Sequence, residues 1–270
     1  MLIVTRLFQL SKKLLYFCLP PLILYSLLCL AMFMLQRTMI FIPATAKSDR
    51  FPMIKIENDS DYFAASVHKK TSPTAVIYFG GNAEDVTSSM SSLVECFEGC
   101  SIYAMHYRGY GGSPGKPSEK QLHRDAKMLF DQVAASHSKV IVIGRSLGSG
   151  VAVRLAAENK VDRLLLVTPF DSLASVAQSQ FPFLPVKLLM LDPFNSSAVA
   201  SKISSPTLIL AAAQDEIIPA SSTQRLADAF TKGICTYEII DHADHNSLEL
   251  PSELIQKFIG GEDKTQDSSE

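Results

Sequence analysis

The residue best placed to do chemistry in this sequence is a serine flanked by glycines at fixed spacing. It is the middle residue of Gly144-Arg145-Ser146-Leu147-Gly148, a G-x-S-x-G pentapeptide. The apolar run 140–143 predicts a buried strand before it, and the apolar spacing after Gly148 predicts a helix. A sharp strand-to-helix turn strains its central residue, exposes that side chain and requires glycine on both sides. Ser146 is therefore predicted to be a nucleophile at a helix start, where the field favours an anionic intermediate.

A nucleophilic serine needs a base, normally a histidine held by a carboxylate. In a strand–turn–helix setting the expected order along the chain is serine, acid, histidine. The histidines that follow Ser146 are His242 and His245, both just past the last predicted strand. We favour His245 because it lies further into the loop, and His242 is the alternative, otherwise a surface loop residue.

The acid is expected after the strand 206–212, the one before the strand that leads to the two histidines. Asp215 lies there between apolar segments, where a carboxylate without a partner would be costly and a histidine would satisfy it. Glu216 is the nearest competitor. Asp171 is a second candidate that fits better as the cap of the following helix. Asp241 and Asp244 are too close in sequence to the histidines to orient them well.

An oxyanion hole requires two backbone N–H groups near the nucleophile. One is expected from Leu147, directly after Ser146. The other is expected from the loop after the strand 75–79, where Gly80-Gly81 allows close approach of the backbone, and we choose the N–H of Asn82. Asn82 is equally suited to cap the next helix, and the two roles are compatible.

Strands and helices alternate along most of the chain, which predicts an α/β fold with a mostly parallel central sheet and helices on both faces. Strands are expected at 53–56, 62–68, 75–79, 101–106, 140–143, 163–167, 206–212 and 235–240. Helices are expected between Asn82 and about residue 97, at 118–135 with Ser118 as N-cap, after residue 148, at 223–230 and at 251–259. Residues 171–205 interrupt the rhythm and predict a small helical cap over the carboxyl edge of the sheet, where ligands bind.

The N-terminal segment is expected to cross a membrane. Leu14–Leu35 carries no charge and is long enough to span the hydrocarbon core, and Pro20-Pro21 predicts a kink or the start of the helix. Basic residues on both sides set the orientation only weakly, but a short basic tail before a large domain favours a cytoplasmic N-terminus and a catalytic domain on the non-cytoplasmic side. The alternatives are a signal peptide cleaved after Ala44-Thr45-Ala46 and a buried hairpin.

The bulk composition excludes several classes of function. A formal net charge of −2 over 270 residues gives no sign of a nucleic-acid partner. The five cysteines lack zinc-like spacing with histidines, so we expect thiols, with no metal and no cofactor. The polar segment 261–270 is expected to be disordered.

Several motifs together resemble one family, the N-terminally membrane-anchored α/β-hydrolases, a group that includes yeast bud-emergence-suppressor-like and human α/β-hydrolase-domain proteins. They are Gly-Gly-Asn-Ala (80–83), Tyr-Arg-Gly-Tyr-Gly-Gly-Ser-Pro-Gly (107–115), Gly-Arg-Ser-Leu-Gly-Ser-Gly (144–150), Gln-Asp-Glu-Ile-Ile-Pro (214–219) and Asp-His-Asn (244–246), with Gln-Arg-Thr-Met-Ile-Phe-Ile-Pro (36–43) before them. The family usually has His-Gly in place of Gly80-Gly81, and Gly-His-Asn-Asp in place of residues 244–247.

This resemblance implies Ser146, Asp215 and His245 as a catalytic triad, with Asn82 and Leu147 at the oxyanion hole. It implies a tail and anchor at 1–35 and an α/β-hydrolase domain at 36–260. The anchor and the apolar cap favour a hydrolase of carboxylic esters or thioesters acting on lipid-like or acylated substrates. The alternatives are a peptidase or amidase with the same triad, and a non-catalytic binding protein with this fold.

Overall fold

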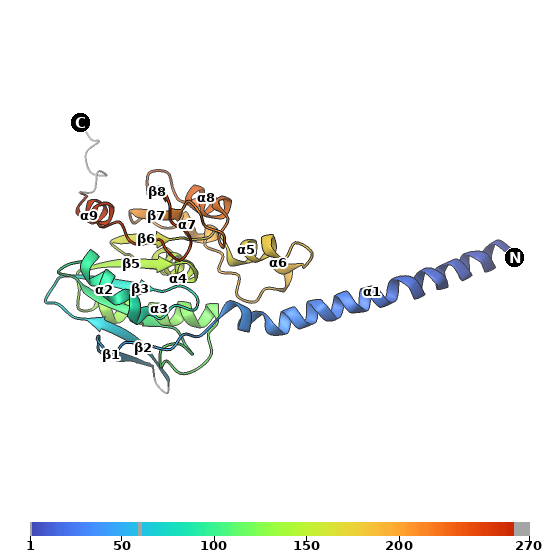
Figure 1. Cartoon of the computed structure of the whole chain (residues 1–270), viewed down its shortest axis with the longest axis horizontal. Coiled ribbons are helices and arrows are strands. Elements are labelled where there is room, and N and C mark those ends of the chain that lie inside the picture. The colour runs from blue at the N-terminus through green and yellow to red at the C-terminus, as the bar shows by residue number, and fades with distance from the viewer. Residues whose placement is uncertain (1, 59–60, 262–270) are drawn as a thin grey trace.

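A long N-terminal helix extends away from a layered α/β domain in this computed structural model, which describes residues 2–58 and 61–261 (Figure 1). Helix α1 comprises Leu2–Ile40, and its segment Tyr16–Ile40 is long and apolar enough to cross a membrane. Pro20 and Pro21 lie inside the helix, so the expectation that they mark its start is wrong. The expected boundary between anchor and domain after residue 35 also falls within α1.

The domain is organised around a sheet whose order is β1-β2-β4-β3-β5-β6-β7-β8. β1 pairs antiparallel with β2, and β2 pairs antiparallel with β4, while all pairs from β4 to β8 are parallel. The strands are β1 (Met53–Asn58), β2 (Asp61–His68), β3 (Thr74–Phe79), β4 (Ser101–His106), β5 (Lys139–Arg145), β6 (Arg163–Val167), β7 (Thr207–Ala212) and β8 (Cys235–Ile240). The expected mostly parallel sheet is confirmed, and each expected strand is present within two residues at either end.

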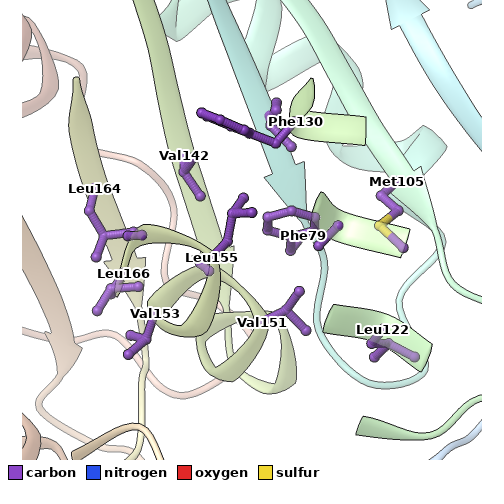
Figure 2. Close-up of a cluster of buried hydrophobic side chains, with 14 of the residues drawn as sticks. Phe79, Met105, Leu122, Phe130, Val142, Val151, Val153, Leu155, Leu164 and Leu166 are labelled. Carbon is purple, nitrogen blue, oxygen red and sulfur yellow. The ribbon is translucent and has the colours of Figure 1, made fainter. Parts of the chain in front are cut away.

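Strands buried on both faces read as continuous apolar runs, because successive side chains point to opposite sides. In β5, Val140 and Val142 enter one core, and Ile141 and Ile143 enter the other. The first core is covered by α3 (Glu119–Ala134) and α4 (Leu147–Glu158). Figure 2 shows residues from both helices packed on Phe79, Met105, Val142, Leu164 and Leu166 of the sheet.

The opposite face of the sheet is covered by α2 (Val86–Cys96) and α9 (Ser252–Gly260), which contribute Met90, Leu93 and Ile255 to the second core. α8 (Ala220–Ala229) packs on the first face through Leu226. It begins three residues before the expected position. Ser118 caps α3 as expected, since its side chain accepts from the N–H of Gln121.

Residues 171–205, expected as a cap, contain three short helices, α5 (Leu173–Gln180), α6 (Val186–Leu189) and α7 (Ser197–Ala200). α5 and α6 lie on the same side of the domain as α1 (Figure 1). The expected disordered tail lies, from residue 262 onward, outside the described residues.

Candidate functional site

Ser146 occupies a strained turn between β5 and α4. Its backbone has φ 48° and ψ −117°, and residues other than glycine rarely adopt such a positive φ. A Cβ at Gly144 would lie 2.5 Å from the carbonyl oxygen of Gly148, and one at Gly148 would lie 2.1 Å from that of Phe79. Because both contacts are impossible, the two glycines are obligatory, and they bring the start of α4 against the end of β3.

Ser146, His245 and Asp215 meet at the carboxyl edge of the sheet. His245 Nε2 is 2.8 Å from Ser146 Oγ, and His245 Nδ1 is 2.8 Å from Asp215 Oδ2. The side chains of His245 and Asp215 are only 9% and 8% exposed, so water is largely excluded from their contact. The other oxygen of Asp215 accepts from the N–H groups of Ile217 and Ile218, which fixes the carboxylate.

The loop that carries His245 is held by the arginine next to the nucleophile. The half-buried Arg145 donates to the carbonyl oxygens of Leu248 at 2.9 Å, His245 at 3.2 Å and Asn246 at 2.9 Å. One side chain thus fixes the loop relative to the strand end that bears Ser146. The sequence could have indicated this role, because a charged side chain next to the central serine at the edge of the sheet requires hydrogen-bond acceptors nearby.

Asp244 also braces this loop from within. Its carboxylate accepts from the N–H groups of Asn246 and Ser247, and Ser247 Oγ accepts from the N–H of Asp244. The backbone hydrogen bonds from Ser247 and Asn246 lower the pKa of Asp244, so it stays ionised. Asp244 and Ser247 stand where the resembled family has glycine and aspartate, and they keep the turn closed here.

The alternative residues lie elsewhere or have other partners. His242 and Glu216 are exposed, and neither makes a hydrogen bond within residues 2–58 and 61–261. Asp171 pairs with Arg225 at 2.8 Å and accepts from Ser222 at 2.5 Å, both on α8. The expectation that Asp171 caps a helix is wrong, because the neighbouring Ser172 caps α5.

The two predicted oxyanion donors, Asn82 and Leu147, line the same cavity as Ser146. The backbone N–H groups of Asn82 and Leu147 find no acceptor in the described part of the chain. The N–H of Gly81 is already used, since it donates to Glu84 Oε2 at 2.5 Å. Asn82, Ser146 and Leu147 all line one cavity, so both free donors can face a group bound there.

The loop Gly80–Asn82 is held by side chains that sequence reasoning missed. Glu84 accepts from the N–H of Gly81 and also from the hydroxyls of Tyr78 and Ser89, while Tyr107 donates to the carbonyl oxygen of Gly80 at 2.7 Å. Burial raises the pKa values of Tyr78 and Tyr107 well above the usual range of tyrosine, and the nearby negative charge of Glu84 raises both pKa values further. Both tyrosines therefore remain donors at neutral pH.

The side chain of Asn82 links this loop to the chain that leaves α1. Its Oδ1 accepts from the N–H of Ile42 at 2.9 Å, from the hydroxyl of Tyr110 at 2.9 Å and from the N–H of Ala83 at 3.0 Å. The resembled family has histidine-glycine before this asparagine. Here Glu84, Tyr107 and Tyr110 hold the loop in place. The position of Glu84 between the glycine pair and α2 was the feature of the sequence that could have indicated this role.

The site opens into an apolar cavity of about 360 Å³, which lies in the range of small-molecule sites. Its walls come from the end of α1, from the cap helices α5 and α6 and from the loop after β7, at Met32, Phe33, Ile40, Phe181, Leu184 and Ile217 among others. No charged residue is among the described residues that line it. The contribution of α1 was not expected from the sequence.

Metal ligands do not gather anywhere in residues 2–58 and 61–261, where no group of three His, Cys, Asp or Glu side chains could hold an ion. That the chain needs no metal or cofactor remains a prediction. The five cysteines are free thiols, of which Cys96 is buried and Cys18 exposed.

Comparison with known proteins gives relatives that are similar in sequence. Residues 75–191 match the hydrolase family described as serine aminopeptidase, S33. An uncharacterized protein of Mycobacterium tuberculosis is 36% identical over 182 residues, which cover 65% of this chain and 64% of that protein. The α/β-hydrolase domain-containing protein WAV2 of Arabidopsis thaliana is 29% identical over 165 residues, covering 53% of this chain and 54% of its own.

Solved structures share the fold at low identity. The Pyrococcus furiosus esterase Pf2001 superposes with a TM-score of 0.65 at 18% identity, covering 82% of this chain and 98% of its own. Est1E of Butyrivibrio proteoclasticus, solved with ferulic acid, gives 0.62 at 16% identity, with coverages of 76% and 97%. The chain therefore has the α/β-hydrolase fold, as expected, and its residues 75–191 carry the sequence pattern of the S33 hydrolases.

Proposed function

We propose that this chain is a membrane-anchored serine hydrolase that cleaves carboxylic esters or thioesters of apolar acyl groups. The observation that carries the proposal is the continuous hydrogen-bonded series Ser146–His245–Asp215, in which Ser146 lines an apolar cavity. The matching hydrolase family and the esterases of the same fold support it.

In the proposed reaction Ser146 Oγ attacks the acyl carbonyl carbon while His245 Nε2 takes its proton. Asp215 accepts from Nδ1 and stabilises the imidazolium. The N–H groups of Asn82 and Leu147, with the helix start of α4, stabilise the tetrahedral oxyanion. His245 then gives the proton to the leaving alcohol or thiol. Water, activated by the same histidine, cleaves the acyl-enzyme and regenerates Ser146.

The lining of the cavity favours an apolar acyl group over a peptide. An aminopeptidase must recognise a cationic α-amino group, and a buried cation needs a carboxylate partner. The described lining residues offer polar groups such as Gln36, Gln180 and Asn82, but none with a negative charge. The S33 description keeps amide cleavage as the second candidate, and aminoacyl amides assayed beside esters distinguish the two.

Attachment to a membrane through α1 is proposed on the length and apolar character of Tyr16–Ile40. The three basic residues before the apolar run, Arg6, Lys12 and Lys13, favour a cytoplasmic N-terminus and a catalytic domain on the other side.

The test is labelling of the full chain in detergent or nanodiscs with a fluorophosphonate, followed by hydrolysis of p-nitrophenyl esters. We expect the label on Ser146 and none on the Ser146→Ala variant. Asp215→Asn is expected to lower labelling strongly while leaving the fold intact, because it disturbs the tautomer of His245. Absence of label on a folded wild-type chain, or equal labelling of Ser146→Ala, would refute the hydrolase proposal.

A further inference from the structure

Helix α1 and the cap are joined between Tyr25 and Arg37, that is, from the middle of the apolar segment to its end. Four hydrogen-bonded contacts connect them: Tyr25 hydroxyl to the Phe183 carbonyl at 2.9 Å, Gln36 Nε2 to the Leu189 carbonyl at 3.2 Å, Leu191 N–H to Gln36 Oε1 at 2.7 Å and Arg37 to Asp192 at 2.8 Å. The partly buried residues of this part of α1, Cys29, Met32, Phe33, Gln36 and Ile40, recur at helical spacing and form one stripe. The stripe indicates a built interface with the domain.

The lengths involved do not allow α1 to cross a bilayer while the cap stays in water. At about 1.5 Å per residue, the uncharged residues before Tyr25, Leu14–Leu24, measure only about 16 Å. A hydrocarbon core is about 30 Å thick, so these residues cover about half of it. The remainder must come from the part of α1 beside the cap. Tyr25 lies about 18 Å along the helix from Arg37, the first charge after the apolar run.

The tip of the cap has the surface that such a position requires. Residues 181–191 read Phe-Pro-Phe-Leu-Pro-Val-Lys-Leu-Leu-Met-Leu, with Lys187 as the single charge. Phe183 is 87% exposed and Leu188 is 83% exposed, and α6 has no buried residue. Water-facing surfaces of monomeric proteins rarely carry apolar groups in this density. Lys187 has a long stem that can carry its ammonium to the membrane surface.

We infer that the cap tip (residues 181–191) lies in the hydrocarbon of the bilayer beside α1, and that apolar chains reach Ser146 from within that leaflet. The inference rests on the membrane attachment and hydrolysis proposed above. The cavity supports the route, because Met32 and Phe33 of α1, Phe181 and Leu184 of the cap, and Ser146 itself line the same space. The ion pair of the half-exposed Arg37 with Asp192 then marks the boundary between lipid and water.

The absence of tryptophan from the sequence makes a direct test possible. Phe183→Trp and Leu188→Trp each introduce a single fluorophore at an exposed site of the cap tip. Ile239→Trp is the matched control, since Ile239 is also apolar and 57% exposed but lies on β8. The full chain is placed in vesicles of phosphatidylcholine brominated on its acyl chains, which quench tryptophan by contact.

We expect both cap variants to lose most of their emission in brominated vesicles relative to unbrominated ones, and Ile239→Trp to keep its emission. Equal quenching of all three variants would overturn the inference. So would blue-shifted, unquenched emission from the cap variants, which would place the tip against protein such as a second copy of this chain. Fluorophosphonate labelling of the same samples separates the proposals. Label without quenching sinks only the bilayer contact, and quenching without label sinks only the hydrolase.

Discussion

Replacing Arg145 with alanine should reduce turnover strongly although the triad itself stays intact. Arg145 donates three hydrogen bonds to the loop that carries His245. A hydrogen bond in a folded protein contributes about 1 kcal/mol net, and a charged donor contributes more, but partial exposure of this loop reduces the gain. We expect Arg145→Ala to destabilise the loop by about 2–3 kcal/mol.

The loss should appear in the chemical step, because a released loop must be reordered before His245 can take the proton of Ser146. If about 2 kcal/mol of this cost enters the barrier, kcat/KM falls about 30-fold. The same change lowers Tm by about 4–12 °C for a domain of this size. Arg145→Lys should recover only part of the loss, since an ammonium lacks the planar fork that reaches several carbonyl oxygens.

The assay is ester hydrolysis with kcat and KM determined separately, together with thermal unfolding. Arg154→Ala on α4 is the matched control. Its ion pair with Glu158 is about half exposed on both sides and contributes less than about 0.5 kcal/mol. An Arg145→Ala variant with wild-type kcat and a lowered Tm would refute the positioning role and leave only a structural one.

Three further changes test other parts of the site. Met32→Trp should fill part of the cavity and lower kcat/KM for decanoyl esters about tenfold or more, while kcat/KM for acetate esters stays unchanged. The reason is that each methylene group of the acyl chain that no longer contacts the apolar lining loses about 0.8 kcal/mol of binding free energy. Met34→Trp is the control, because Met34 is 72% exposed and does not line the cavity, and it should change neither rate. Glu84→Gln should lower kcat about tenfold with little change in KM, since the loop that presents the Asn82 N–H loses a charged acceptor. Burial raises the pKa of Asp171, but hydrogen bonds from Arg225 and Ser222 outweigh it and the net pKa is lowered. The stabilisation is therefore present above the ordinary aspartate pKa of about 4 and is lost as the pH falls below it, and Arg225→Ala should flatten this acid limb in unfolding experiments.

Each of these expectations has a plain contrary result. Identical chain-length profiles for Met32→Trp and Met34→Trp would show that α1 does not bound the acyl site. An unchanged kcat in Glu84→Gln would show that Glu84 does not position the loop that carries Asn82 for the reaction. An acid limb that persists in Arg225→Ala would assign the pH dependence to other carboxylates.

Local pattern was sufficient for the sheet and for the turn that holds Ser146. Apolar runs such as Val140–Ile143 are dictated by burial on two faces, and the glycines at 144 and 148 are dictated by contacts under 3 Å, so both leave a trace in the sequence. The choice between His242 and His245 rested on a weaker signal, loop position. The hydrogen bonds of His245 now favour it on geometry.

The supporting residues were harder to find, because their partners are remote in sequence. Arg145 reaches a carbonyl group 103 residues away, and Gln36 pairs with the cap across 155 residues. No periodicity records such pairs. The run Leu14–Leu35 reads equally as a lipid-facing span or as a helix with one side on protein, since both surfaces are apolar. The pairing with the cap therefore emerges only once the fold is assembled.

The hydrogen bond from Ile42 to Asn82 has a practical consequence for anyone who wishes to handle this protein in plain buffer. Cutting the gene so that translation starts after Pro43 is an obvious way to gain solubility. It would also delete Ile42, whose N–H holds the side chain of Asn82, and the residues of α1 that line the cavity beside Ser146. Low activity of such a shortened chain would therefore not count against the activity proposed for the full chain.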